Sequence, residues 1–162
     1  MQANMIIVGM ADLKATKSPG ALTTLGLGSC VGIALYDARV KVAGLAHIML
    51  PDSKQIQNNS NLAKFADTAM IQLLKDMERL GATRLNMKAK IAGGAQMFAF
   101  NAANDNLRIG DRNVEATIQL LRQYNIPLLA KECGENYGRT VELYADDGRF
   151  VIKSVGRGVK TV

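Results

Sequence analysis

The 162 residues of this chain suffice for one folded domain, which at this length buries about 70% of the surface that the unfolded chain exposes. The formal net charge of +6 comes from scattered Lys and Arg residues, and aromatic residues make up only 5%. This composition argues against a nucleic-acid-binding protein, because such proteins usually cluster basic residues beside aromatic side chains that stack on bases.

Membrane insertion and metal binding are also disfavoured. No apolar run approaches the roughly 18 residues of a membrane span, and the first residues, Met1–Ile7, lack the basic region and cleavage site of a signal peptide. We therefore expect a cytoplasmic protein with a single domain over residues 1–162 and reduced cysteines. Two cysteines and one histidine are too few for an ordinary zinc site, so neither a metal nor another cofactor is expected.

Short apolar runs predict strands in the first part of the chain. Met5–Met10 is the first predicted strand and Ala21–Leu27 the second. Between them, the segment Lys14–Gly20 contains Pro19-Gly20 and is typical of a loop or turn.

The next two apolar runs, Val31–Asp37 and Lys41–Leu50, predict an antiparallel hairpin. A two- or four-residue loop would place Cys30 directly opposite His47, with the two Cβ atoms about 5 Å apart. An odd loop would shift the register by one residue and turn one of the two side chains away.

One long segment shows the periodicity of an amphipathic helix. Apolar residues recur every three or four positions from Leu62 to Leu80. Ser60 or Asn61 can cap this helix, and Gly81 suits its C-terminal end. The polar segment before it, Gln55–Asn61, is expected to be a mobile loop beside the site.

The second half of the chain alternates strands with one more helix. The predicted elements are a strand at Met87–Ile91, a polar loop at Asn101–Asn106, a helix from about Asn113 to Tyr124 capped by Asp111 or Asn113, and strands at Ile126–Glu132, Thr140–Ala145 and Arg149–Val155. Two helices and about seven strands imply an α+β fold with a mixed sheet, or a pair of sheets, covered by the two helices.

Cys30 and His47 are the candidate reactive residues, since a thiol and an imidazole are the minimum parts of a cysteine nucleophile with its base. An adjacent imidazolium would lower the thiol pKa toward an ion pair. Backbone N–H groups near Gly28, Ser29 and Val31 would hold a developing oxyanion. Each residue alone is more often structural, because a cysteine in a β-rich stretch is usually a small core residue. Cys133 has no such neighbours in sequence and is interpreted as structural.

Four segments together resemble the chemoreceptor glutamine deamidases, the CheD family. They are Leu25–Val31, His47–Pro51, Gly93–Phe98 and Ile109–Asn113, in the order and spacing of that family. The resemblance covers nearly the whole chain, although the part after Pro127 carries no specific motif.

The resemblance implies an enzyme that hydrolyses glutamine side chains on methyl-accepting chemotaxis receptors to glutamate. It implies a fold similar to the cytotoxic necrotizing factor cysteine hydrolases and a Cys–His–Thr triad at Cys30, His47 and Thr24. Thr23 is adjacent, and a slip of one residue would exchange the two threonines. A CheC-type phosphatase of the response regulator is the implied partner.

Two other functions stay open from the residues themselves. The chain could be an adaptor that binds receptors and the phosphatase, with catalysis secondary. It could also be a cysteine peptidase or transglutaminase, because the sequence does not decide whether water or an amine resolves the thioester.

Overall fold

The computed structural model describes residues 4–97 and 108–162, so the loop predicted at Asn101–Asn106 lies outside the described residues. The described part forms ten strands and two α-helices. The strands are β1 (Met5–Ile7), β2 (Asp12–Lys17), β3 (Ala21–Leu27), β4 (Val31–Asp37), β5 (Val42–Ile48), β6 (Met87–Gly93), β7 (Leu128–Cys133), β8 (Arg139–Tyr144), β9 (Phe150–Ser154) and β10 (Gly158–Thr161). The helices are α1 (Ala66–Arg79) and α2 (Ile109–Gln123), with short 3₁₀ turns at Ser53–Gln55, Leu62–Lys64 and Arg84–Asn86.

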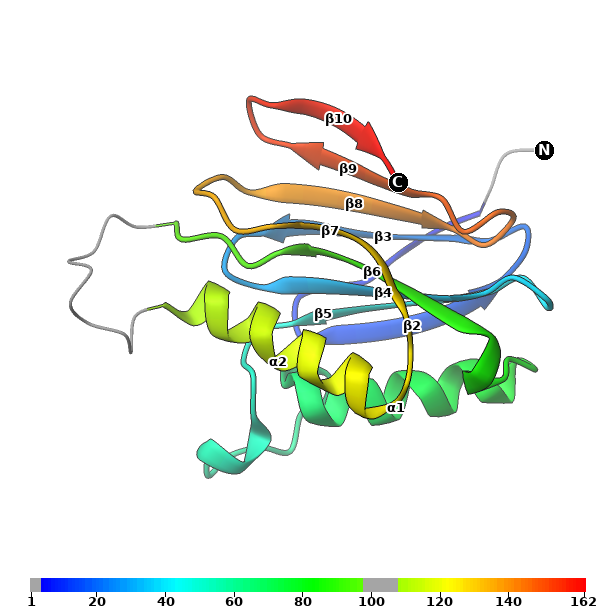
Figure 1. Cartoon of the computed structure of the whole chain (residues 1–162), viewed down its shortest axis with the longest axis horizontal. Coiled ribbons are helices and arrows are strands. Elements are labelled where there is room, and N and C mark those ends of the chain that lie inside the picture. The colour runs from blue at the N-terminus through cyan, green and yellow to red at the C-terminus, as the bar shows by residue number, and fades with distance from the viewer. Residues whose placement is uncertain (1–3, 98–107) are drawn as a thin grey trace.

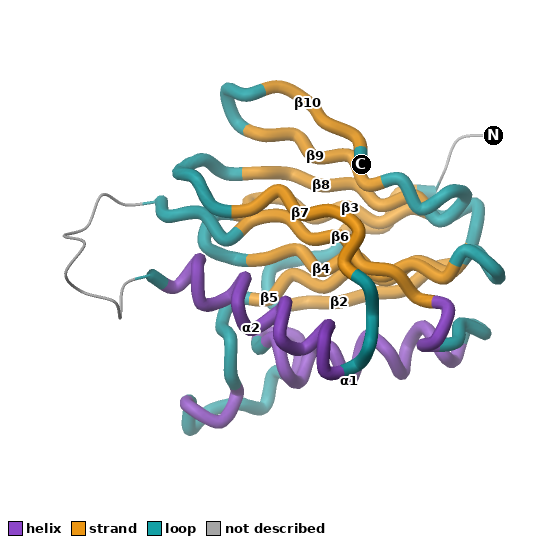
Figure 2. The backbone as a smooth tube through the Cα atoms, in the orientation of Figure 1, coloured by secondary structure: helices purple, strands orange, loops and turns teal. Residues whose placement is uncertain are grey.

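The strands form two mixed five-stranded sheets, which confirms the predicted α+β class. Sheet A has the order β1-β3-β8-β9-β10, and sheet B has the order β2-β5-β4-β6-β7. Only β1 with β3 and β6 with β7 are parallel among the described pairs. Both helices lie on the same side of the strands (Figures 1 and 2).

Alternation along β4 and β5 gives sheet B two buried faces. Val31, Ile33 and Ile48 belong to a core shared with α1 and α2. Ala34 and Leu45, which point the other way, belong to a second core shared with sheet A. The molecule therefore has three layers, and the inter-sheet layer is the one that receives Thr24 and His47.

The prediction of a loop over Lys14–Gly20 was wrong for its first half. Residues Asp12–Lys17 form β2, an edge strand that pairs antiparallel with β5. The polar residues Asp12, Lys14 and Thr16 alternate with Leu13 and Ala15, which pack on the helical core. This period of two was masked by the high polarity of the segment. The turn at Pro19-Gly20 was predicted correctly. The last strand, β10, was not predicted.

The first helix begins later than the periodicity suggested. Asn61 accepts a hydrogen bond from the Ala63 N–H and caps only a 3₁₀ turn. Phe65 is extended because it bridges Leu50, whose carbonyl accepts the N–H of Ala66. The end was predicted correctly, with Gly81 at a φ of +100°.

The second helix begins earlier than predicted, at Ile109 rather than Asn113. Its first turn is in close contact with the segment after β6. A Cβ on Gly110 would lie 2.6 Å from the carbonyl oxygens of Gly94 and Ala95. Asn113 is consequently not a cap but a fully buried residue inside the helix.

Candidate active site

Thr24, Cys30 and His47 come from three separate segments of the two sheets. Thr24 lies in β3 of sheet A and His47 in β5 of sheet B. Cys30 lies in the connection between the sheets, one residue before β4 begins. All three are buried, with Cys30 retaining 7% of its surface exposed.

A hydrogen bond joins Thr24 to His47 across the two sheets. Thr24 Oγ1 lies 2.7 Å from His47 Nδ1, and it also donates to the Val8 carbonyl at 2.7 Å. A hydroxyl has one hydrogen, so Thr24 must accept from the ring and Nδ1 carries the proton. The opposite nitrogen, Nε2, is then unprotonated, and it is buried without a hydrogen-bond partner in the described part of the chain.

The two adjacent threonines have different partners. Thr23 Oγ1 donates to the Val141 carbonyl at 2.8 Å, within sheet A. Thr24 alternates to the other face of β3 and is the threonine that contacts His47. Val8 was missed by the sequence analysis, since a backbone carbonyl carries no side-chain signal.

The predicted pairing of Cys30 directly opposite His47 was wrong by two residues. Gly32 pairs with His47 in the ladder of β4 and β5. The loop has four residues as considered, but it spans 38–41 and closes on the pair of Asp37 with Val42, one position further along each strand than the predicted pairing requires. Lys41 in this loop has a φ of +54°. A shift of two keeps the parity, so Cys30 and His47 face the same layer as diagonal neighbours, which are about 7–8 Å apart and within reach of long or aromatic side chains.

Three consecutive carbonyls around the thiol are held by donors from distant segments. Gly28 O accepts from Ala95 N at 2.8 Å, Ser29 O from Asn113 Nδ2 at 2.9 Å, and Cys30 O from Gly94 N at 2.8 Å. Gly93 allows this approach, since a Cβ there would lie 2.3 Å from the Cys30 carbonyl oxygen. In the sequence, Gly93, Gly94 and Asn113 stand in two of the motifs, but no local signal connects them with Cys30.

The fixed carbonyls leave backbone donors available beside the thiol. The N–H groups of Ser29 and Cys30 bond no backbone carbonyl in residues 4–97 and 108–162. The N–H of Gly28 donates to Gly26 at 3.0 Å, and Val31 is a ladder residue of β4. Of the three predicted oxyanion residues, Ser29 therefore has the N–H with the best opportunity to bind an oxyanion.

Burial shifts the pKa values of both reactive groups, in directions that oppose the predicted ion pair. Burial raises the pKa of the Cys30 thiol, partly offset by its own backbone N–H. Burial also lowers the pKa of His47. Both shifts favour the uncharged forms, a thiol and a neutral imidazole.

Cys133 lies at the end of β7, beside Gly93 of β6. Burial raises the pKa of its thiol to about 11, an effect that nearby Arg139 and Lys131 partly oppose. A thiol with this pKa is almost entirely protonated at neutral pH and a poor nucleophile.

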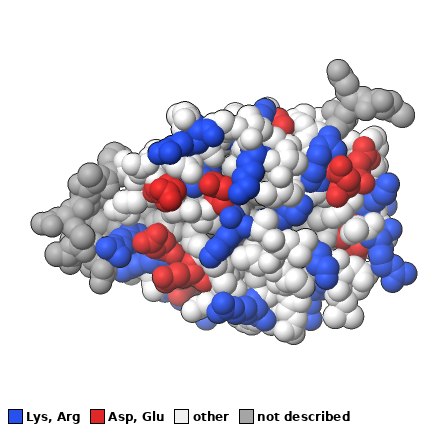
Figure 3. All heavy atoms as spheres, turned by 45° about the horizontal axis from the view of Figure 1, so that its top comes forward, with Lys and Arg blue, Asp and Glu red and all other residues white. Residues whose placement is uncertain are grey.

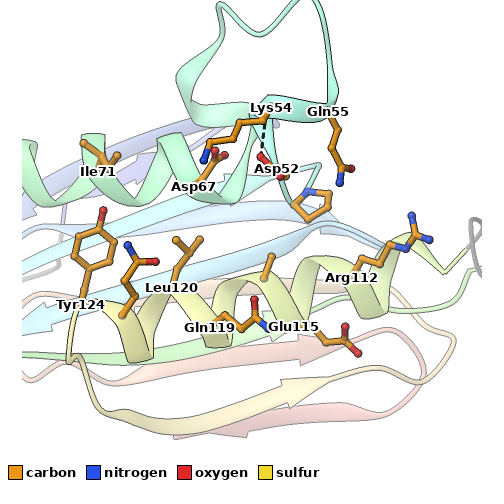
Figure 4. Close-up of a pocket in the computed structure, with 13 residues that line it drawn as sticks. Asp52, Lys54, Gln55, Asp67, Ile71, Arg112, Glu115, Gln119, Leu120 and Tyr124 are labelled. Atoms are coloured by element: carbon orange, nitrogen blue, oxygen red, sulfur yellow. Dashed lines mark hydrogen bonds between the residues drawn. The ribbon is translucent and has the colours of Figure 1, made fainter.

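A wide groove among the described residues is lined by other residues than those of this site. It has a volume of about 950 Å³ between α1, α2 and the segment 51–55, and neither Cys30 nor His47 lines it (Figure 4). Acidic and basic side chains, among them Asp67, Glu115 and Arg112, line it from both sides.

Charged residues show no single-sign concentration on the face drawn in Figure 3, where basic and acidic side chains are interspersed. Two ion pairs, Lys153–Glu142 and Arg149–Asp147, have N–O distances of 3.1 and 3.0 Å.

Among the described residues, no group of three or more His, Cys, Asp or Glu side chains could hold a metal, and no helix is long and apolar enough to cross a membrane.

A thiol and a histidine that face the same layer, with a third group orienting the histidine, is an arrangement suited to a cysteine hydrolase. Comparison with known proteins places the chain in a family. Residues 49–154 match the family described as CheD chemotactic sensory transduction, and the chain belongs to this family.

Relatives match the chain over nearly its full length. A probable chemoreceptor glutamine deamidase CheD of Lachnoclostridium phytofermentans is 56% identical over 158 residues, 98% of each chain. The chemoreceptor glutamine deamidase CheD of Halalkalibacterium halodurans is 50% identical over 98% of this chain and 99% of its own. A solved structure, the Bacillus licheniformis hypothetical protein YfiH, is 17% identical with a TM-score of 0.45, covering 75% of this chain and 51% of that one.

Proposed function

We propose that this chain deamidates glutamine side chains of chemoreceptors to glutamate, the activity for which its relatives are named. The observation that carries the proposal is the bond between Thr24 and His47. In this bond the Nδ1–H of His47 donates to Thr24 Oγ1, which fixes the orientation of the ring and leaves Nε2 free to accept a proton. A histidine held in this tautomer is suited to act as a general base.

In the first half of the reaction, Cys30 Sγ attacks the side-chain carbonyl carbon of a receptor glutamine while His47 Nε2 takes the thiol proton. The pair begins uncharged, as the opposed pKa shifts favour. The resulting imidazolium donates a proton to the amide nitrogen. The C–N bond breaks, ammonia leaves and a thioester to Cys30 remains.

In the second half, His47 removes a proton from water and the hydroxide attacks the thioester. The C–S bond breaks, the thiolate recovers the proton from the imidazolium, and glutamate is released. Both tetrahedral intermediates carry a negative oxygen, for which the N–H groups of Ser29 and Cys30 are the proposed donors. No cofactor enters any of these steps.

We also propose a CheC-type phosphatase as a protein partner and the cytoplasm as the location, where reducing conditions keep Cys30 free. An adaptor role with secondary catalysis is the second candidate. The excess positive charge favours acidic partners in either case.

The test incubates the whole chain with a soluble cytoplasmic chemoreceptor fragment. Released ammonia and the conversion of glutamine to glutamate are followed by mass spectrometry. We expect one ammonia to be released for each glutamine that is converted to glutamate. Binding of the fragment without ammonia release would favour the adaptor, and incorporation of an added primary amine in place of water would indicate a transglutaminase.

A further inference from the structure

Asn113 contacts both segments that carry the proposed reactive residues. Its side-chain Nδ2 lies 2.9 Å from the Ser29 carbonyl, next to Cys30. The same nitrogen lies 2.9 Å from the Met49 carbonyl, two residues after His47. One fully buried amide of α2 therefore bridges the two segments.

The chemistry of the bridge requires this kind of side chain. A side-chain amide has two N–H donors on one nitrogen, and two carbonyl acceptors use both. An aspartate of the same shape has none when ionised, and a serine has one. The Oδ1 of Asn113 is buried with no partner among the described residues, an arrangement that costs stability. The same amide therefore combines two hydrogen bonds from Nδ2 with an unpaired Oδ1.

The backbone around Asn113 is also shaped for this contact. Gly110 lets the first turn of α2 approach Gly94 and Ala95, whose N–H groups hold the Cys30 and Gly28 carbonyls. The helix and the segment after β6 therefore form one support beneath the thiol. Asn113 extends this support to the chain that leaves β5.

We propose that Asn113 is a positioning residue, which sets the separation of Cys30 Sγ and His47 Nε2 by holding Ser29 and Met49 together. This inference rests on the proposed deamidation. Because proton transfer between the two groups depends on their separation, loss of the bridge should lower kcat and leave KM nearly unchanged.

The test compares Asn113→Ser and Asn113→Asp with the control Thr117→Val. Thr117 is buried one turn along α2, and its hydroxyl bonds only the Asn113 carbonyl among the described contacts. We expect both Asn113 variants to lose about 10- to 100-fold in kcat, with KM changed less than about threefold. Thr117→Val should keep the kcat of the unaltered chain even where its melting temperature falls.

A second readout does not depend on receptor substrate. The rate at which iodoacetamide alkylates Cys30 near neutral pH is measured in each chain and divided by the rate in His47→Asn. This ratio reports how much His47 assists the alkylation. Asn113→Ser should bring this ratio toward one, while Thr117→Val should preserve it. If the unaltered chain releases no ammonia, the proposed function fails, and this ratio still decides the bridge.

Three outcomes would overturn the inference. The first is an Asn113→Ser variant with unchanged kcat and alkylation ratio. The second is an equal loss in Thr117→Val, which would show a general effect of helix packing. The third is failure of both Asn113 variants to fold while Thr117→Val folds, because Asn113 would then serve the fold as a whole.

Discussion

Thr24 and His47 belong to different sheets, and their side chains meet at 2.7 Å in the layer between them. The contact orients the imidazole only while the two sheets stay packed. The catalytic competence proposed for this site is therefore linked to the inter-sheet core rather than to one hairpin.

Replacing Thr24 by valine keeps its shape and removes the hydroxyl. The His47 Nδ1–H and the Val8 carbonyl then lose their partner, and we expect a stability loss of about 1–3 kcal/mol. The kcat of deamidation should fall about 10- to 100-fold because the ring is no longer held. Urea denaturation and steady-state kinetics measure the two effects.

Thr23→Val is the matched control, since its hydroxyl bonds Val141 within sheet A. It should retain kcat. Impaired turnover in Thr23→Val, with normal turnover in Thr24→Val, would show that Thr23 and not Thr24 orients His47.

Cys30→Ala should abolish ammonia release and leave the circular dichroism spectrum unchanged, because only the nucleophile is removed. Cys133→Ala should retain most activity, since its thiol pKa of about 11 leaves it protonated at neutral pH. Equal losses in the two variants would contradict the choice of nucleophile.

The alkylation of Cys30 should depend on pH as that of a buried thiol does. Because burial raises its pKa, the rate with iodoacetamide should be slow at neutral pH and still increase beyond about pH 8.5. Peptide mass spectrometry separates Cys30 from Cys133. A rate that reaches a plateau below pH 7 would instead indicate the thiolate–imidazolium pair.

Stability should decrease on acidification because of His47. Its pKa is lowered by burial in the folded state and is about 6.5 when unfolded, so the unfolded chain binds the proton more readily below that pH. The free energy of unfolding should fall from pH 7 downward, by at most about 1.4 kcal/mol per pH unit for this proton. Asp12 on β2 pairs with His47 in the ladder and is the acid that faces it. Asp12 is partly exposed, and its Oδ2 lies 3.7 Å from Lys14 Nζ.

His47→Asn should show a shallower dependence on pH in chemical denaturation between pH 5 and 7. An identical slope in the variant and the unaltered chain would mean that His47 titrates normally in the folded protein.

Gly110→Ala should destabilise the protein by about 1–3 kcal/mol, since a methyl group would overlap two backbone oxygens. Activity should fall as well, because the same displacement moves Asn113. Gly9→Ala is the control, as a Cβ there meets nothing within 4 Å. Equal stability of the two variants in thermal unfolding would show that α2 does not need this close approach.

Local patterns were enough to predict the elements that are regular over several residues. The hairpin of β4 and β5 and the strands β8 and β9 were predicted from their apolar runs. The body of α1 was predicted from its periodicity, because side-chain burial repeats with the geometry of a helix. Short or polar elements were missed. The strand β2 is held by its ladder to β5, and Phe65 is extended because it pairs with Leu50.

The candidate residues themselves came from the sequence, since the chain has one histidine and Cys30 lies in a glycine-rich segment near it. Their arrangement was decided by the tertiary structure. The register of β4 on β5 depends on the turn at 38–41, where the Asp37 carboxylate accepts the N–H groups of Arg39 and Thr83.

Asn113 shows the same limit most clearly, because its two hydrogen bonds join residues 84 and 64 positions apart in the chain. The pattern of one chain indicates which face of a helix is buried. It does not indicate which carbonyl a buried amide will meet, because that depends on how separate elements pack. The identity of the reactive groups is a property of this sequence, and their relative positions are a property of its packed layers.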